Sequence, residues 1–405
     1  MLFSPHRWLR ISILNLLIVS VIGVILRYKI LYSLPFFDQK HLLHGHSHFA
    51  FAGWITQALM ALLVTYLCRQ NATIVFKKYE RLLIINLITA YGMLISFPIE
   101  GYGFFSILFS TLSIFVSYTF AIIYWKDLNR LPEKSISHYW FKAALIFNAI
   151  SSAGAFSLAI MMVTKTIHQN WYLAAIYFFL HFQYNGWFFF SCMGLLNEKI
   201  QPLVSENSKL KKIFWLFAIA CIPAYFLSAL WLKIPLIIYV LVIAAALLQV
   251  IAWGWLVKLI KNNWRLIKQQ IPPTATWILA FSAAALSIKL LLQLGSVIPA
   301  LSDLAFGFRP IVIGYLHLVL LGVITLFILG YIFAFKQLFI SKTSLMALWI
   351  FTAGILFNET LLMIQGVSAM YYVNVPYINE LLLFAALLMF SGLLILNMSQ
   401  VKRNS

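Results

Sequence analysis

The sequence contains few charged residues and very few acidic ones. Only 10% of its 405 residues are Asp, Glu, Lys or Arg, and just 10 side chains are Asp or Glu. Soluble globular domains carry roughly 25% charged and ~45–50% apolar residues. This chain is 63% hydrophobic, with a mean hydropathy of +0.93. The composition therefore excludes a soluble globular protein and predicts a polytopic membrane protein.

Cysteine motifs and soluble segments are also missing. Cys68, Cys192 and Cys221 form neither a CxxC pair nor a CxxCH haem-attachment site. The longest polar connections, about 197–212 and 259–274, are too short to fold alone. The basic N-terminus leads into an apolar run without a small-residue cleavage site, which predicts a retained first helix. We therefore expect one transmembrane domain over 1–405 and no separate soluble domain.

Long apolar runs dominate the sequence instead. A bilayer core of ~30 Å needs roughly 20 apolar residues per helix, and the sequence holds twelve such runs. They predict an all-α membrane bundle with helices at about 9–31, 44–68, 81–99, 103–125, 139–163, 171–196, 212–232, 234–258, 275–297, 309–335, 343–366 and 377–399.

The basic residues predict how this bundle is oriented. All but seven of the 29 Lys and Arg residues fall on one side of a twelve-helix topology. The positive-inside rule makes that side cytoplasmic, with both termini on it. The net charge of +19 then reports orientation in a lipid bilayer and not a nucleic-acid partner. The exceptions are Arg27, Lys29, Lys40, Lys165, Lys233 and Arg309 on the other side and Lys289 within the ninth run.

Three of the nine histidines lie inside apolar runs at similar depth. His48, His181 and His317 are all expected in the outer half of the membrane. A buried imidazole needs a partner and is a good ligand for haem iron or copper, which favours one shared haem or metal site. In the alternative interpretation, each histidine only hydrogen-bonds between helices.

Other residues near these histidines are secondary candidates. Tyr184 and Tyr315 are placed to hydrogen-bond within the site, although both are also ordinary members of an aromatic-rich chain. His44 and His46, at an outer loop–helix junction, suggest a local copper or zinc site or simply an interfacial position. Lys289 and Glu359 lie within predicted spans, where they can join a proton path or pair with another group.

The local sequences around the three histidines carry a family resemblance. They read HGHSHFAFAGW at 44–54, HFQYNGWFFF at 181–190 and GYLHLVLLG at 314–322. Twelve helices with outer histidines on helices 2, 6 and 10 resemble subunit I of the haem–copper oxidases and nitric oxide reductases. The resemblance implies that His48 and His317 are the axial ligands of a six-coordinate haem b. It also makes His181, followed one turn later by Tyr184, the counterpart of a copper ligand.

The sequence departs from that family at its active site. The family's two adjacent copper-binding histidines are absent from 212–232, and Tyr315 replaces the first histidine of the family's H-x-H motif. Four-electron oxygen reduction is therefore not expected, and the copper ligand set is incomplete. The chain is more similar to shorter subunit-I-like bacterial proteins, including nitric-oxide-response haem membrane proteins.

The resemblance implies a haem protein of the bacterial cytoplasmic membrane, serving electron transfer or a nitric oxide or oxygen response. It leaves enzymatic activity open, leaning against it, and suggests respiratory-chain or other membrane subunits as partners. Arg309, eight residues before His317, is placed to meet a haem propionate or to anchor the interface.

Two other functions remain as alternatives. One is a transporter or channel for a metal ion or small solute, with the outer histidines as its entry site. Transporters often carry internal repeats, and we recognise none in this sequence. The other is a membrane metal-dependent oxidase or hydrolase, which normally needs more histidines or an HEXXH motif, absent here.

Overall fold

The computed structural model describes residues 4–70, 77–166, 168–232, 234–302 and 308–401, and every secondary-structure element in these ranges is a helix. Ten of the helices there are long and apolar enough to cross a membrane. The chain is thus a helical multi-pass membrane protein. Three basic residues of the charge pattern, Lys233, Lys402 and Arg403, lie outside the described residues.

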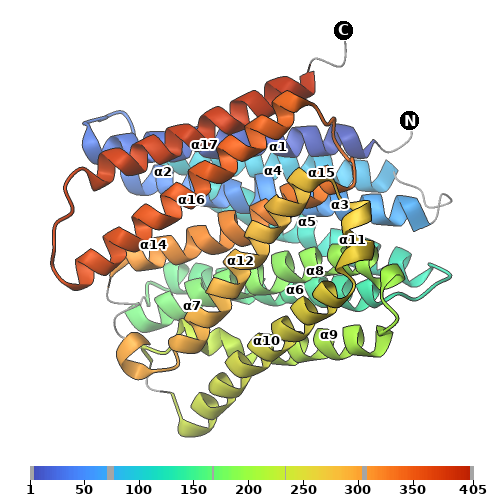
Figure 1. The fold of residues 1–405 in the computed structure, drawn as a ribbon. Helices are drawn as coiled ribbons and strands as arrows, with labels where there is room; N and C mark the ends of the chain where they lie inside the picture. Colours follow the sequence, from blue (N-terminus) through green and yellow to red (C-terminus); the bar gives the residue numbers. More distant parts are fainter. Residues whose placement is uncertain (1–3, 71–76, 167, 233, 303–307, 402–405) are drawn as a thin grey trace. The chain divides into compact units, whose positions relative to one another are not determined.

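The helices follow one another through short connections (Figure 1). Three of them, η1, η2 and η5, are π-helical, and η3 and η4 are 3₁₀-helical. The elements are α1 Pro5–Leu31, α2 Gln39–Phe49, η1 Ala50–Thr56, α3 Gln57–Gln70, α4 Lys77–Glu100, α5 Phe104–Asn129, α6 Ile136–Val163, α7 Gln169–His181, η2 Phe182–Phe188, α8 Phe189–Ile200, η3 Gln201–Leu203, α9 Asn207–Cys221, η4 Pro223–Ser228, α10 Leu236–Asn262, α11 Trp264–Gln270, α12 Pro273–Gly295, α14 Arg309–His317, η5 Leu318–Thr325, α15 Leu326–Ala334, α16 Lys342–Met370 and α17 Ile378–Val401.

Two of the twelve predicted spans are not among the ten. The run 171–196 does form a continuous helix through α7, η2 and α8, but polar residues such as Gln183 and Asn185 occupy its middle. The run 212–232 contains α9, which ends at Cys221 and gives way to η4. Pro223 lacks the N–H that would continue the α-helical ladder. The count of twelve therefore stays a prediction.

The chain divides into two compact units. Unit 1 comprises 1–131, 274–279 and 325–405, and unit 2 comprises 132–273 and 280–324. In unit 1, α17 packs against both α16 and α1, while α4 packs against α2 and α5. In unit 2, α6 packs against α7 and α8, and α9 packs against α10. Each unit buries apolar side chains along these helix contacts.

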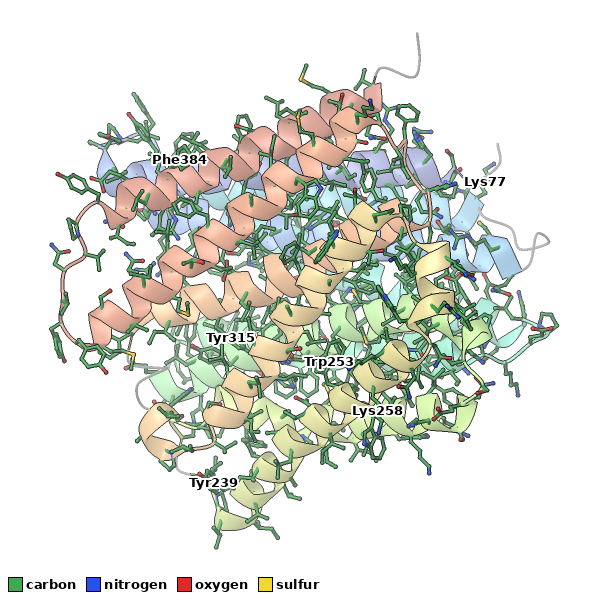
Figure 2. All side chains as sticks on the ribbon, in the orientation of Figure 1. Lys77, Tyr239, Trp253, Lys258, Tyr315 and Phe384 are labelled. Atoms are coloured by element: carbon green, nitrogen blue, oxygen red, sulfur yellow. The ribbon has the colours of Figure 1, made fainter. Side chains whose placement is uncertain are left out.

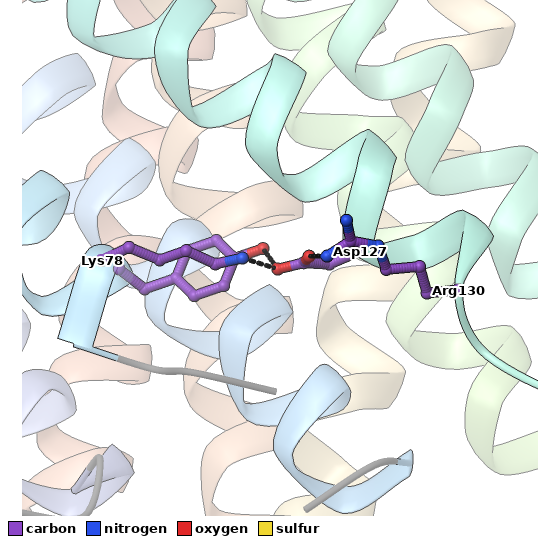
Figure 3. Close-up of polar contacts among 4 residues, drawn as sticks. Lys78, Asp127 and Arg130 are labelled. Atoms are coloured by element: carbon purple, nitrogen blue, oxygen red, sulfur yellow. Dashed lines mark hydrogen bonds and ion pairs between the residues drawn. The ribbon is translucent and has the colours of Figure 1, made fainter. Parts of the chain in front are cut away.

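One buried carboxylate joins two helices at an end of unit 1 (Figure 3). Asp127 on α5 is 2% exposed and accepts a hydrogen bond of 2.7 Å from the hydroxyl of Tyr79 on α4. The ammonium of Lys78 lies 2.5 Å from the same carboxylate, and Arg130 lies 3.5 Å from its other oxygen. Because Asp127 is buried and Arg130 is largely exposed, the contacts to α4 matter most.

Asp127→Ala should destabilise unit 1, because Tyr79 loses a buried hydrogen bond and Lys78 loses its ion pair. We expect a loss of about 1–3 kcal/mol in the free energy of unfolding, measured by denaturant titration in mixed micelles. Arg130→Ala is the control and should change it by less than about 0.5 kcal/mol. Equal effects of the two changes would contradict this account.

Two glycines of unit 2 lie in contrasting surroundings. A Cβ at Gly154 on α6 would lie 2.5 Å from the carbonyl oxygen of Ala175 and 2.8 Å from the nitrogen of Phe179, both backbone atoms of α7. A Cβ at Gly254 on α10 would meet nothing within 4 Å. Gly154 therefore permits the close approach of α6 and α7, whereas Gly254 has no packing role.

Gly154→Ala should force α6 and α7 apart and cost about 1–3 kcal/mol of unfolding free energy. Gly254→Ala should be neutral or stabilise by up to about 1 kcal/mol, because Ala is the better helix former. Thermal unfolding in detergent would compare the two variants. A Gly154→Ala variant as stable as the unchanged protein would show that the α6–α7 contact is looser than described.

Candidate functional site

A π-helical segment follows each of the three intramembrane histidines. His48 lies two residues before η1, His181 directly precedes η2, and His317 directly precedes η5. π-Helical turns are rare and occur frequently at functional sites, because the extra residue re-aims side chains and frees backbone groups. The backbone thus distinguishes the same three positions that the sequence indicated.

The three segments also share a sequence pattern. Each histidine is followed five residues later by glycine, at Gly53, Gly186 and Gly322, and then by Trp54, Trp187 or Val323. A Cβ at Gly53 would lie 2.6 Å from the Phe49 ring, and one at Gly186 would lie 2.5 Å from the Cβ of Phe147. This histidine–glycine spacing of five residues is present in the sequence, but it differs from the three- and four-residue spacings of an α-helical face.

In unit 1, polar side chains hold the backbone of η1. The side-chain amide of Asn15 donates to the carbonyl of Gly53 at 2.6 Å, and that of Asn86 donates to the carbonyl of Ala52 at 3.1 Å. The indole of Trp54 donates to the hydroxyl of Thr325 at 3.0 Å. Carbonyls in a π-helical segment need such partners in a water-free interior. The side chains therefore stabilise the irregular backbone next to His48.

The α2 helix begins at a capping carboxylate. Asp38, just before the span, accepts hydrogen bonds of 2.8 Å from the backbone N–H groups of His41 and Lys40. The bond from His41, with the weaker contribution from Lys40, holds the pKa of Asp38 below its ordinary value. The cap satisfies N–H groups that have no partner inside the helix. It therefore sets the start of α2, the helix that carries His41, His44, His46 and His48.

His48 packs in an aromatic cluster at the end of α4. Its ring stacks on Phe97, with centroids 4.2 Å apart and planes tilted by 14°. Tyr102 makes edge contacts with Phe97 and with His44. A Cβ at Gly45 would lie 3.0 Å from the ring of Pro98, so this turn of α2 packs tightly on α4. The cluster restricts the orientation of the His48 ring.

His44 and His46 lie on different sides of α2. His44 contacts Tyr102, at a centroid distance of 4.7 Å, whereas His46 lies next to Gly23 of α1. Residues two apart in a helix do not face each other, so the helix directs these imidazoles to different neighbours. Across the described residues, no group of three His, Cys, Asp or Glu side chains is placed to hold a metal ion.

His317 has the hydrogen bond expected of an oriented iron ligand. It is the last residue of α14, and its Nδ1 lies 2.8 Å from the carbonyl oxygen of Ile313 one turn earlier. A carbonyl requires Nδ1 to carry the proton, which leaves the lone pair of the neutral ring on Nε2. Histidines that bind metals commonly donate their other N–H to such a carbonyl. His317 therefore fits haem iron through Nε2.

His181 uses both ring nitrogens within unit 2. It is fully buried; Nε2 donates to the carbonyl oxygen of Cys221 at 2.8 Å, and Nδ1 accepts from the Asn185 amide at 3.1 Å. The amide N–H of Tyr225 bonds Ile222 instead of Cys221 in the 3₁₀ turn. His181 thus satisfies a carbonyl at the end of α9. A metal can bind His181 only after one of these hydrogen bonds breaks.

Tyr184 and Tyr315 come together in unit 2. Their rings make an edge contact with centroids 6.4 Å apart. Arg309 is exposed at the first position of α14, two turns before His317. The sequence identified both tyrosines as site residues, but it did not identify Asn185 or Cys221, which hold His181.

Comparison of the chain with models of known protein families and with curated proteins finds no match. In unit 1, the ring of His48 stacks on Phe97. In unit 2, Nδ1 of His317 bonds a carbonyl of its own helix, and His181 is part of a buried hydrogen-bond network.

His181→Phe should destabilise unit 2, because the carbonyl of Cys221 and the amide of Asn185 each lose a buried partner. We expect a cost of about 2–4 kcal/mol in unfolding free energy, since each such loss costs about 1–3 kcal/mol. Thermal unfolding in detergent is the measurement. His168→Phe changes an exposed histidine of the same unit and should leave stability unchanged. Similar stability of both variants would exclude a structural role for His181.

Proposed function

We propose that this chain is a membrane protein that binds b-type haem, with His317 and His48 as the axial ligands of the iron. The observation that carries the proposal is the Nδ1 hydrogen bond of His317 to the Ile313 carbonyl, which places the ring proton on Nδ1 and makes Nε2 the nitrogen that would bind iron. The π-helical segments beside both histidines and the resemblance to oxidase subunit I support it. No described residue other than histidine is needed as an iron ligand.

The proposal includes a twelve-helix topology with both termini in the cytoplasm, in a bacterial cytoplasmic membrane. The alternation of basic residues supports this topology. The continuous helix through α7, η2 and α8, from Gln169 to Ile200, supports counting that segment as a span. The second uncertain segment, 212–232, is the weaker of the two because α9 is short.

The proposed role is electron transfer, or a response to nitric oxide or oxygen, and not complete oxygen reduction. Bound haem would supply a one-electron redox centre whose potential depends on its ligands and burial. The protein would position the rings: Phe97 restricts His48, and the Ile313 carbonyl orients His317. His181 has both nitrogens engaged, so a copper ion would have to displace a hydrogen bond there.

The absorbance of the purified protein tests the proposal. Protein from haem-replete cells should give a reduced-minus-oxidised spectrum of haem b, and His317→Ala should abolish it because the oriented ligand is gone. His168→Ala, which changes an exposed histidine, should leave the spectrum intact. His48→Ala should convert the six-coordinate spectrum to a five-coordinate one that binds carbon monoxide.

A colourless protein, or an unchanged spectrum in folded His317→Ala, would overturn the haem assignment. If the colourless protein also carried metal ions into proteoliposomes, and if changing His44, His46 and His48 together stopped that uptake, the chain would instead be a metal transporter.

A further inference from the structure

Unit 2 buries a lysine in the middle of a predicted span. Lys289 on α12 is only 5% exposed. It shares one helix face with other buried residues, including Ser282, Leu286 and Gln293. Among the residues that the structure describes, no carboxylate lies within ion-pair distance of its ammonium. An amine in this position needs another polar partner.

A small cavity adjoins this lysine. Its volume is ≈ 10 Å³, about what the centre of one water molecule requires. Four polar residues from four helical segments line it together with apolar side chains: Lys289 on α12, Gln249 on α10, Asn185 on η2 and Cys221 on α9. Gln249 is 4% exposed, and its Oε1 is a buried acceptor without a hydrogen-bond donor.

The helices that carry Lys289 and Gln249 are fastened to each other. The indole of Trp253, labelled on α10 in Figure 2, donates to the hydroxyl of Ser287 on α12 at 2.8 Å. The hydroxyl of Tyr239, near the other end of α10, bonds the Val297 carbonyl just after α12. The cavity thus lies along two helices that are fixed by hydrogen bonds on both sides of it.

Asn185 and Cys221, the other two polar residues around the cavity, each donate a hydrogen bond to the protein. The Asn185 amide donates to His181, and the Cys221 thiol donates to the Asn185 carbonyl with an S···O distance of 3.8 Å. His181 and Cys221 are the titratable groups that interact electrostatically with Lys289. In this pocket, Oε1 of Gln249 is therefore a buried acceptor without a donor, and it lines the same cavity as the ammonium of Lys289.

We propose that Lys289 and Gln249 hold a buried water molecule, which makes Lys289 a hydrated proton-exchange site inside unit 2. The water oxygen accepts a hydrogen bond from Nζ of Lys289, and one of its hydrogens is donated to Oε1 of Gln249. A proton on Nζ passes to this water and returns, with no net reaction. The site does not depend on haem binding and so goes beyond the function proposed above.

The local chemistry favours water over a small anion. An anion would accept a hydrogen bond from Lys289, but it would be repelled by the Gln249 oxygen, and the Cys221 thiol and one N–H of the Asn185 amide are already used. Water satisfies a donor and an acceptor at once and matches the size of the cavity. The donor of Lys289, the acceptor of Gln249 and a space for one molecule together favour water as the occupant.

Solid-state NMR of the full-length protein in lipid bilayers, labelled with ¹⁵N at lysine Nζ, tests the proposal. The resonance that disappears in Lys289→Met identifies Lys289, and in the unchanged protein it should show a cross-peak to a slowly exchanging water. Gln249→Met should remove this cross-peak while the Lys289 resonance remains. Lys258→Met, an exposed lysine of α10 (Figure 2), should leave the cross-peak unchanged.

Two outcomes of the NMR experiment would overturn the proposal. One is a Lys289 resonance without a water cross-peak, and the other is a bromide-dependent shift of that resonance, which would indicate an anion. A high-resolution map of the unchanged protein gives a second test if Gln249→Met fails to fold. It should show density within hydrogen-bond distance of both Nζ and Oε1, and a direct Lys289–Gln249 contact would refute the water.

Discussion

The structure depends on satisfying polar groups where no bulk water is present. In a hydrocarbon interior, a backbone or side-chain polar group must find its partner within the protein. This constraint explains why the elements in the described ranges are helices and why most polar residues in the spans bond to carbonyls or to one another. Asn15 and Asn86 bond the backbone of η1, and His181 bonds the end of α9. In both places a side chain supports backbone that leaves the α-helical hydrogen-bond pattern.

His48, His181 and His317 are all polar side chains within apolar segments, and each has a different kind of partner. Both ring nitrogens of His181 are hydrogen-bonded to protein groups, so this residue is part of the packing of unit 2. His317 uses Nδ1 on the carbonyl of its own helix, and this orients the ring without engaging a neighbouring helix through that nitrogen. His48 is positioned by ring stacking on Phe97. One sequence pattern, histidine followed by a glycine five residues later, therefore occurs in three different polar surroundings.

The buried charge of Lys289 is the exception that identifies a place of interest. Asp127, a buried charge that does form an ion pair, has two partners on α4 and joins two helices. Lys289 instead borders a cavity with an unsatisfied amide oxygen, in a part of the protein where helices α10 and α12 are held together by hydrogen bonds. The carboxylate of Asp127 is bonded directly by protein side chains, whereas the cavity beside Lys289 has space for another molecule.

The sequence predicted the positions of most long helices, because a run of about 20 apolar residues is enough to form a membrane-spanning helix. The boundaries of α1, α5, α6 and α10 agree with the expected runs to within a few residues. The segment 212–232 did not, since a proline and a 3₁₀ turn interrupt α9, and local backbone geometry has only a weak hydropathy signal. The π-helical segments were likewise missed, because their period differs from the one used to detect helices.

The sequence by itself determined that the protein is helical and membrane-embedded and that His48, His181 and His317 stand out, because charge and hydropathy are properties of single residues. Only the structure decided which ring nitrogens of His181 and His317 are engaged, that His44 and His46 face different neighbours, and that Lys289 meets Gln249 at a cavity. Apart from the bonds within one helix, such as that of His317 to Ile313, these facts depend on distances between residues far apart in the chain. The scarcity of charge therefore places the chain in a membrane, while the partner available to each buried polar group determines its role there.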